Sequence, residues 1–219
     1  MEPTHKIGFK TLILSTGSVA CVEILLLILP KACGIEAMIA LGSARIVDIS
    51  LIVLVICLSE GLSAIGVSST GLTRGIKRGI LWSAAVGCGA FLGFGIFYVL
   101  GINLLPLIHT QVPSGGLGIL LLFCVGGLVG PIAEELFFRG IVYGFLRQWG
   151  ALAAVMGSTL LFVPAHPGGY NQIPAMQAIG GVLFSLSYEI EKNLLVPILI
   201  HVLGNISIFV LSLGTLPGP

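Results

Sequence analysis

Charge is the property that this sequence has least of. Of its 219 residues only 9% are charged and 56% are hydrophobic, and the mean hydropathy is +1.11. A soluble globular domain has about 25% charged residues, so this composition excludes an ordinary soluble fold and indicates an integral membrane protein. The net charge of +1, with no basic patch, also gives no reason to expect nucleic acid as a partner. The lipid bilayer is the expected environment.

Several kinds of catalytic motif are also absent. The single aspartate, Asp48, cannot supply the pair that an aspartyl protease needs, and none of the four histidines is followed by glutamate, as a His-Glu-x-x-His zinc motif requires. Ser63, in Gly-Leu-Ser-Ala, only weakly approximates a nucleophile motif. The cysteines have no metal-type spacing and lie mostly within apolar runs, so we expect small core residues at Cys21, Cys33, Cys57, Cys88 and Cys124.

The long apolar runs predict an all-α fold, a polytopic transmembrane helix bundle of seven to eight spans. No repeat or linker divides the chain, so residues 1–219 are expected to form a single integral membrane domain. Lys6 and Lys10 precede a first run that is longer than the core of a cleaved signal peptide, which favours an uncleaved anchor. The expected spans are residues 11–30, 46–65, 80–100, from 117 through a glutamate pair, 151–166, 173–188 and 194–213.

The distribution of basic residues predicts the orientation of these spans. With the N-terminus inside, the inner segments hold eight lysines and arginines, whereas the outer segments hold only Lys31 and Arg45. Cytoplasmic segments of membrane proteins carry the excess of basic residues. We therefore expect a multi-pass protein with a cytoplasmic N-terminus.

A pair of adjacent carboxylates, Glu134 and Glu135, follows an apolar run, and Arg139 lies one helical turn later. A charged group at bilayer depth costs about 2.5–3.5 kcal/mol on insertion scales, and such groups are usually functional. Glu135 and Arg139 have the i,i+4 spacing of a helical ion pair. This pairing leaves Glu134 without a partner, so Glu134 is the candidate for chemistry.

Three further polar residues can converge on Glu134. Glu134 lies 16 residues before Gly150 and His166 lies 16 residues after it, so two antiparallel helices would place both about 24 Å from the turn. His201 and Asn205 are four residues apart and share one helix face. One polar residue in an apolar span is usually an interhelical hydrogen bond, but four that converge indicate a site. A glutamate can act as general base toward water, while histidine and asparagine stabilise an oxyanion.

The three motifs Glu134-Glu135-x-x-x-Arg139, Phe162-x-x-x-His166 and His201-x-x-x-Asn205 occur in this order. In this respect the chain resembles the CAAX protease and bacteriocin-processing (CPBP) family of glutamic intramembrane endopeptidases, which is related to the type II CAAX prenyl endopeptidase. The resemblance covers a motif-bearing protease core at residues 115–213 and implies a bundle of about eight helices.

The resemblance also implies roles for the motif residues. Glu134 corresponds to the base that activates water, His166 to its catalytic partner, and His201 and Asn205 to the oxyanion stabilisers. Structural support falls to Glu135 and Arg139 as an ion pair, and to Phe162 as a residue packed beside the site. The implied partner is a membrane-associated protein or peptide substrate. No metal or other cofactor is expected, and the oligomeric state is left open.

Other functions remain compatible with the same residues. Glu134, His166 and His201 are of the right type to bind a catalytic zinc ion. Members of the resembled family also include proteins proposed as bacteriocin-immunity factors, regulators and scaffolds, so a non-catalytic role is a second alternative. A transporter is a third, since intramembrane carboxylates also serve in proton relays, and Glu23 and Glu60 would then take part. Otherwise these two glutamates are expected to pack between helices or to reach out at helix ends.

Overall fold

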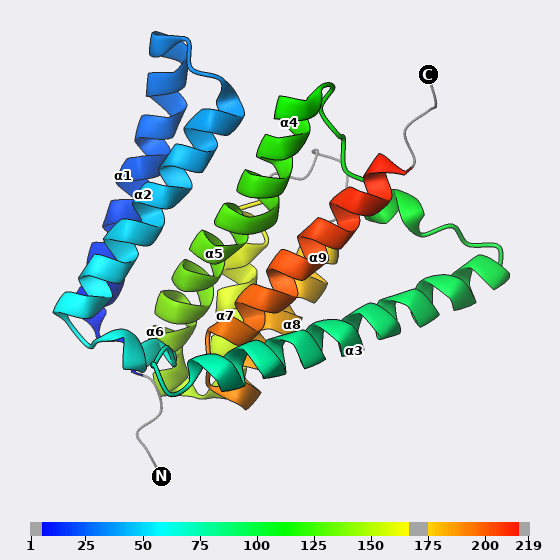
Figure 1. Ribbon diagram of the computed structural model, residues 1–219. Coiled ribbons are helices and arrows are strands. Elements are labelled where there is room, and N and C mark those ends of the chain that lie inside the picture. The colour runs from blue at the N-terminus through cyan, green and yellow to red at the C-terminus, as the bar shows by residue number, and fades with distance from the viewer. Residues whose placement is uncertain (1–5, 167–174, 215–219) are drawn as a thin grey trace.

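The computed structural model describes residues 6–166 and 175–214, and every regular element within them is a helix, as predicted. Figure 1 shows one bundle in which α1 begins at the lower end of the view and α9 ends at the upper end. The elements are α1 (Phe9–Cys33), α2 (Ala37–Leu58), η1 (Leu62–Ile65), α3 (Leu72–Val99), η2 (Leu105–Leu107), α4 (Gly116–Leu121), η3 (Leu122–Val129), α5 (Gly130–Glu135), η4 (Leu136–Tyr143), α6 (Gly144–Leu146), η5 (Arg147–Trp149), α7 (Ala151–Phe162), α8 (Ala175–Glu191) and α9 (Leu195–Leu213).

A continuous helical rod, Gly116–Trp149, carries the glutamate pair. The rod is irregular, because the π-helical segments η3 and η4 flank the short α-helical piece α5 on both sides. Pro131, near the start of α5, has no N–H and would clash with the preceding turn of a regular α-helix. The wider turns of η3 relieve this conflict, and such π-helical turns are frequent at functional sites.

Helices α1 and α2 form an antiparallel hairpin that packs against the rod. Gly34, with φ +65°, ends α1, and the side chain of Glu36 accepts a hydrogen bond from the first turn of α2. A Cβ atom on Gly42 of α2 would lie 2.8 Å from a methyl carbon of Val125 in η3. This glycine therefore lets the hairpin approach the rod closely at that level.

Helix α2 begins and ends earlier than the span expected from the sequence. The helix spans Ala37–Leu58 instead of the expected 46–65, so Arg45 and Asp48 lie inside it and Arg45 is not in an outer loop. The cause is an interhelical ion pair, since Glu23 of α1 lies 2.5 Å from Arg45. A prediction from local hydropathy places such charged residues in a loop, because hydropathy does not show that a residue on another helix neutralises the charge.

Helix α3 crosses α9 and is fixed at its N-terminal part. A Cβ on Gly79 would lie 2.6 Å from Cδ1 of Leu199, so the two helices meet closely at this glycine. Arg78, next to this glycine, and Trp82, about one turn later, donate from Nε and Nε1 to Glu191 Oε1 at the end of α8, at 2.9 and 3.0 Å. Beyond this contact α3 diverges from α9, as Figure 1 shows.

Five helical segments in the described part of the chain are long and apolar enough to cross a membrane: Phe9–Cys33, Ala37–Leu58, Leu72–Val99, Gly116–Trp149 and Leu195–Leu213. The remaining two predicted spans are shorter helices, α7 with 12 residues and α8 with 17. The expected seven to eight spans are therefore not confirmed. The start of the predicted sixth span, at residue 173, lies outside the described residues.

The expectation that the cysteines are core residues is wrong, because all five are exposed on the helix bundle. They do lie within or beside apolar helices, as the sequence indicates. The outer surface of the bundle is itself apolar, with many exposed leucine, isoleucine and phenylalanine side chains. In such a protein hydropathy cannot distinguish the face that packs inward from the face that meets lipid.

Two left-handed glycines offer a matched test of the packing between η1 and the turn after α8. Gly66 has φ +74°, and a Cβ there would lie 2.2 Å from the backbone oxygen of Lys192, whereas Gly34 has φ +65° with nothing within 4 Å. Gly34→Ala should cost about 1–2 kcal/mol through backbone strain alone. Gly66→Ala should cost about 1–3 kcal/mol more, because the clash is with backbone. Thermal unfolding in detergent measures both, and equal losses of stability would contradict this packing.

Candidate active site

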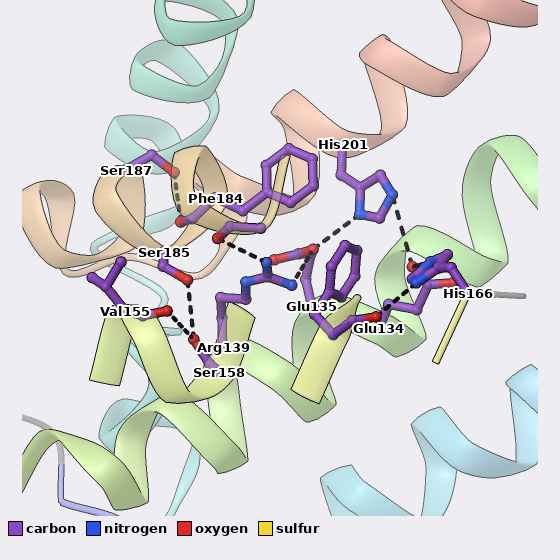
Figure 2. Close-up of polar contacts among 12 residues, drawn as sticks. Glu134, Glu135, Arg139, Val155, Ser158, His166, Phe184, Ser185, Ser187 and His201 are labelled. Atoms are coloured by element: carbon purple, nitrogen blue, oxygen red, sulfur yellow. Dashed lines mark hydrogen bonds and ion pairs between the residues drawn. The ribbon is translucent and has the colours of Figure 1, made fainter. Parts of the chain in front are cut away.

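The predicted convergence of Glu134 and His166 is confirmed. Glu134 comes from α5, and His166 follows the end of α7. The Oε2 atom of Glu134 lies 3.2 Å from Nε2 of His166, and about a quarter of each side chain is exposed. Figure 2 shows the two side chains pointing toward one another. The carboxylate and the imidazole therefore form a direct pair at a partly open position.

Hydrogen-bond chemistry shows how many protons this pair holds and places one of them. The Nδ1 atom of His166 lies 2.9 Å from the carbonyl oxygen of Phe162, which can only accept, so Nδ1 carries a proton. The contact between Nε2 and the Glu134 carboxyl group then needs one further proton, located on either partner. The pair thus holds a proton that it can exchange with a bound molecule.

His201 reaches the same place from α9, where it is 7% exposed. Its Nδ1 atom lies 2.9 Å from Glu135 Oε1, and its Nε2 atom lies 3.8 Å from Glu134 Oε2. Glu135 Oε1 also accepts a hydrogen bond from Arg139 Nη1, so we assign His201 Nδ1 as the donor in the first contact. Figure 2 shows the ring between the two glutamates, with its Nε2 side turned toward Glu134.

The predicted ion pair between Glu135 and Arg139 is confirmed and is fully buried. Arg139 Nη1 lies 3.0 Å from Glu135 Oε1, and neither side chain is exposed. Arg139 Nη2 also donates to the carbonyl oxygen of Gly181 in α8 at 3.1 Å. The pair therefore ties the rod, α8 and, through His201, α9 to one point.

Aromatic rings enclose this pair and both histidines. Phe162 is 2% exposed, and its ring centroid lies 4.4 Å from that of His166 and 4.4 Å from the Arg139 guanidinium carbon. Phe162 thus packs beside the site, as predicted. Phe184 of α8 stacks on His201 with centroids 4.6 Å apart, an arrangement that sequence reasoning missed. No motif marks Phe184, since it is one phenylalanine in an apolar helix.

Asn205 lies one turn beyond His201 on α9, but its contact differs from the expected one. Its Nδ2 atom donates to the backbone oxygen of Gly126 in η3 at 2.9 Å. The amide thus binds the irregular rod, whereas His166 and His201 approach Glu134 itself. The structure therefore brings three of the four predicted catalytic residues together and places the fourth against the backbone beside them.

A cavity of about 340 Å³ lies next to Glu134 and His166. Its opposite wall carries three charged side chains that sequence reasoning did not assign to the site: Glu23 of α1 with Arg45 and Asp48 of α2. The available signal was the presence of charged residues within two apolar runs. The cavity volume is in the range of small-ligand pockets, about 300–1,000 Å³.

The two glutamates named for a transporter have separate surroundings. Glu60 accepts hydrogen bonds from the backbone N–H of Gly8 at 2.9 Å and from the Thr11 hydroxyl, so it holds the start of α1. Glu23 pairs with Arg45 at the cavity. Glu60 therefore has the helix-packing role that the sequence favoured, whereas Glu23 belongs to the surroundings of Glu134.

Removing Arg139 tests the buried pair. Arg139→Ala removes the arginine partner of the buried Glu135 carboxylate and leaves it only the His201 Nδ1 contact, which should cost about 3–5 kcal/mol of stability. The matched control is Arg74→Ala, since Arg74 is 73% exposed and its ion pair with Glu191, at 4.0 Å, should contribute about 0–1 kcal/mol. Thermal unfolding in detergent compares them. An Arg139→Ala protein as stable as the control but slow in catalysis would move Arg139 from support to substrate binding.

The comparisons with known proteins concern the part of the chain that holds these motifs. The family model described as type II CAAX prenyl endopeptidase Rce1-like matches residues 116–207. The membrane-embedded CAAX protease MroQ of Staphylococcus aureus (strain USA300) is 38% identical over 85 residues, which is 36% of this chain and 34% of that protein. The chain thus covers about a third of the relative's length. No solved structure matches the chain significantly.

The matched residues 116–207 include every motif residue of the site, from Glu134 to Asn205. They exclude α1, α2 and all of α3, and with α1 and α2 the charged wall of the cavity. The resemblance that the three motifs indicated is therefore confirmed: residues 116–207 match the type II CAAX prenyl endopeptidase Rce1-like model, and part of the chain is similar to a membrane-embedded CAAX protease.

Proposed function

We propose that this chain is an intramembrane endopeptidase of the glutamic type, which hydrolyses a peptide bond of a membrane-associated protein or peptide. The observation that carries this proposal is the approach of two imidazoles to one carboxyl group beside a cavity. Glu134 lies 3.2 Å from His166 Nε2 and 3.8 Å from His201 Nε2, next to about 340 Å³ of open volume. A general base must lie within hydrogen-bond distance of the water that it activates, and the cavity beside Glu134 has room for that water and for a substrate carbonyl.

The reaction begins with a water molecule held by Glu134 in the cavity. As the water oxygen attacks the substrate carbonyl carbon, one of its protons passes to the Glu134 carboxylate. The carbon–nitrogen bond then breaks, and Glu134 returns that proton to the leaving amine nitrogen. His166 is protonated on Nδ1 toward Phe162, so its Nε2 side shares the proton of the pair and orients the carboxylate. The products are a carboxylic acid and an amine, and the acid then passes its proton to the amine or to water.

His201 is assigned to the developing oxyanion. Its ring is fixed by the Glu135 contact at 2.9 Å and by the stacked Phe184. This role uses the imidazolium form of His201, which donates from Nε2 as well as from Nδ1. A positioned donor of this kind is worth about 10²–10³-fold in rate. Asn205 adds a second donor once its amide leaves the Gly126 oxygen that it binds in the structure.

A zinc metalloprotease that uses Glu134, His166 and His201 is the second candidate. One observation favours it: the Nδ1 atom of each histidine faces an oxygen, at 2.9 Å in both cases, as in the outer shell of metal-bound histidines. Against it, no three histidine, cysteine or acidic side chains are grouped as a metal-ion site within residues 6–166 and 175–214. The glutamic reaction therefore accounts better for the geometry.

Isosteric replacement of the base tests the proposal. Glu134→Gln keeps the size and a hydrogen bond of the side chain but cannot take a proton, so cleavage should fall by about 10²–10⁴-fold. His166→Ala and His201→Ala should also abolish cleavage. The matched control is Glu36→Gln, an exposed glutamate at the start of α2, which should retain full activity. Purified protein in proteoliposomes is incubated with membrane protein fragments, and new termini are identified by mass spectrometry.

The same assay separates the alternatives. Activity that persists in Glu134→Gln would remove this residue as the base. Activity that is lost with a chelator and restored by zinc would establish the metalloprotease. A folded wild-type protein that cleaves nothing would favour the non-catalytic scaffold or immunity-type role. Thermal unfolding of each variant shows whether a loss of activity is a loss of fold.

A further inference from the structure

The cavity wall opposite the candidate catalytic residues carries a compact charged cluster, formed by Glu23, Arg45 and Asp48. Arg45 Nη1 lies 2.5 Å from Glu23 Oε1 and 2.7 Å from Asp48 Oδ2, so one nitrogen holds both carboxylates. All three residues line the cavity together with Glu134 and His166. A molecule in this cavity therefore meets the charged cluster and the catalytic pair at the same time.

The cluster is one positive charge short. Two carboxylates share a single guanidinium, so the formal charge of this wall is −1 when both carboxylates are ionised. Asp48 is only 2% exposed, yet its Oδ1 atom has no hydrogen-bond partner. A buried acceptor without a partner costs about 1–3 kcal/mol, and more when it is charged. The missing interaction is thus a hydrogen-bond donor, preferably a cationic one.

A purely structural role does not account for this composition. One carboxylate would suffice to neutralise Arg45 and to join α1 to α2, and Glu23 alone does both. The second carboxylate, Asp48, adds buried charge and an unused acceptor. Its location at the cavity, and not at the outer surface of the hairpin, indicates that the partner enters with a ligand.

We propose that Asp48 and Glu23, held in place by Arg45, form a specificity subsite for a basic side chain of the peptide substrate. The inference rests on the proposed protease function. The cavity also has apolar lining, from Val19 and Phe137 among others, against which the methylene stem of a lysine or arginine can lie while its head reaches the exposed Glu23 carboxylate beside Asp48. Arg45 is a positioning residue here, because it orients both carboxylates. The subsite selects the residue at one fixed distance from the bond that Glu134 hydrolyses.

The experiment profiles cleavage of a peptide mixture in detergent micelles. The mixture is a bacterial proteome cleaved with cyanogen bromide, so lysine and arginine occur at internal positions. Wild-type protein should enrich basic residues at one position relative to the cut by about tenfold, the effect of one charge-assisted hydrogen bond. Asp48→Asn should lower this enrichment to about threefold or less, and Glu23→Gln should lower it partly. Glu36→Gln, outside the cavity, should leave it unchanged.

Enrichment is a ratio within one sample, so it does not depend on how much of a variant is folded. Cleavage with no basic preference, or a full preference in Asp48→Asn, would overturn the subsite and leave the protease function intact. A preference for acidic residues that is lost in Arg45→Gln would overturn it in favour of carboxylate capture. If wild-type protein cleaves nothing, the proposed function fails instead. The subsite is then tested by binding of a fluorescent decapeptide with lysine or norleucine, and equal binding would overturn it.

Discussion

The Glu135–Arg139 pair is the point on which the candidate site depends. With neither side chain exposed, each charge is tolerable only because the other lies 3.0 Å away. Glu135 orients His201 from α9, Arg139 binds the backbone of α8, and the guanidinium lies against the ring of Phe162 from α7. Three helices are therefore positioned by one ion pair. The adjacent residue, Glu134, faces the cavity because neighbouring side chains on a helix point about 100° apart.

Sequence reasoning succeeded where the interactions are local or where two helices are joined by a short turn. The Glu135–Arg139 pair follows from an i,i+4 spacing, and the meeting of Glu134 with His166 follows from equal distances to Gly150. The meeting of Glu134 with His166 is correctly predicted although the rod is irregular, because η4 and α6 still run continuously to that turn. The motif order also indicated the family resemblance, since the motif residues lie within one contiguous stretch that the Rce1-like model matches.

The parts that could not be predicted depend on contacts between distant segments. Arg45 was assigned to a loop, because only the position of Glu23 on another helix shows how its charge is tolerated within α2. The bond from Asn205 to the Gly126 oxygen requires the π-helical turn of η3, for which Gly and Pro give only a general hint of irregularity. The exposed cysteines show the same limit, since an apolar surface and an apolar core have the same composition.

The length of the rod has a consequence for how a substrate arrives. Gly116–Trp149 has 34 residues, and Glu134 lies 18 residues from its start and 15 from its end, which is more than about 20 Å from either end at 1.5 Å per residue. A bilayer core is only about 30 Å thick, so a rod that spans it holds Glu134 well away from bulk water. For the proposed hydrolysis, the peptide bond must leave water and unfold into the bilayer before it reaches the carboxylate. Partitioning into lipid is thus a first filter, which acts before any side chain of the protein touches the substrate.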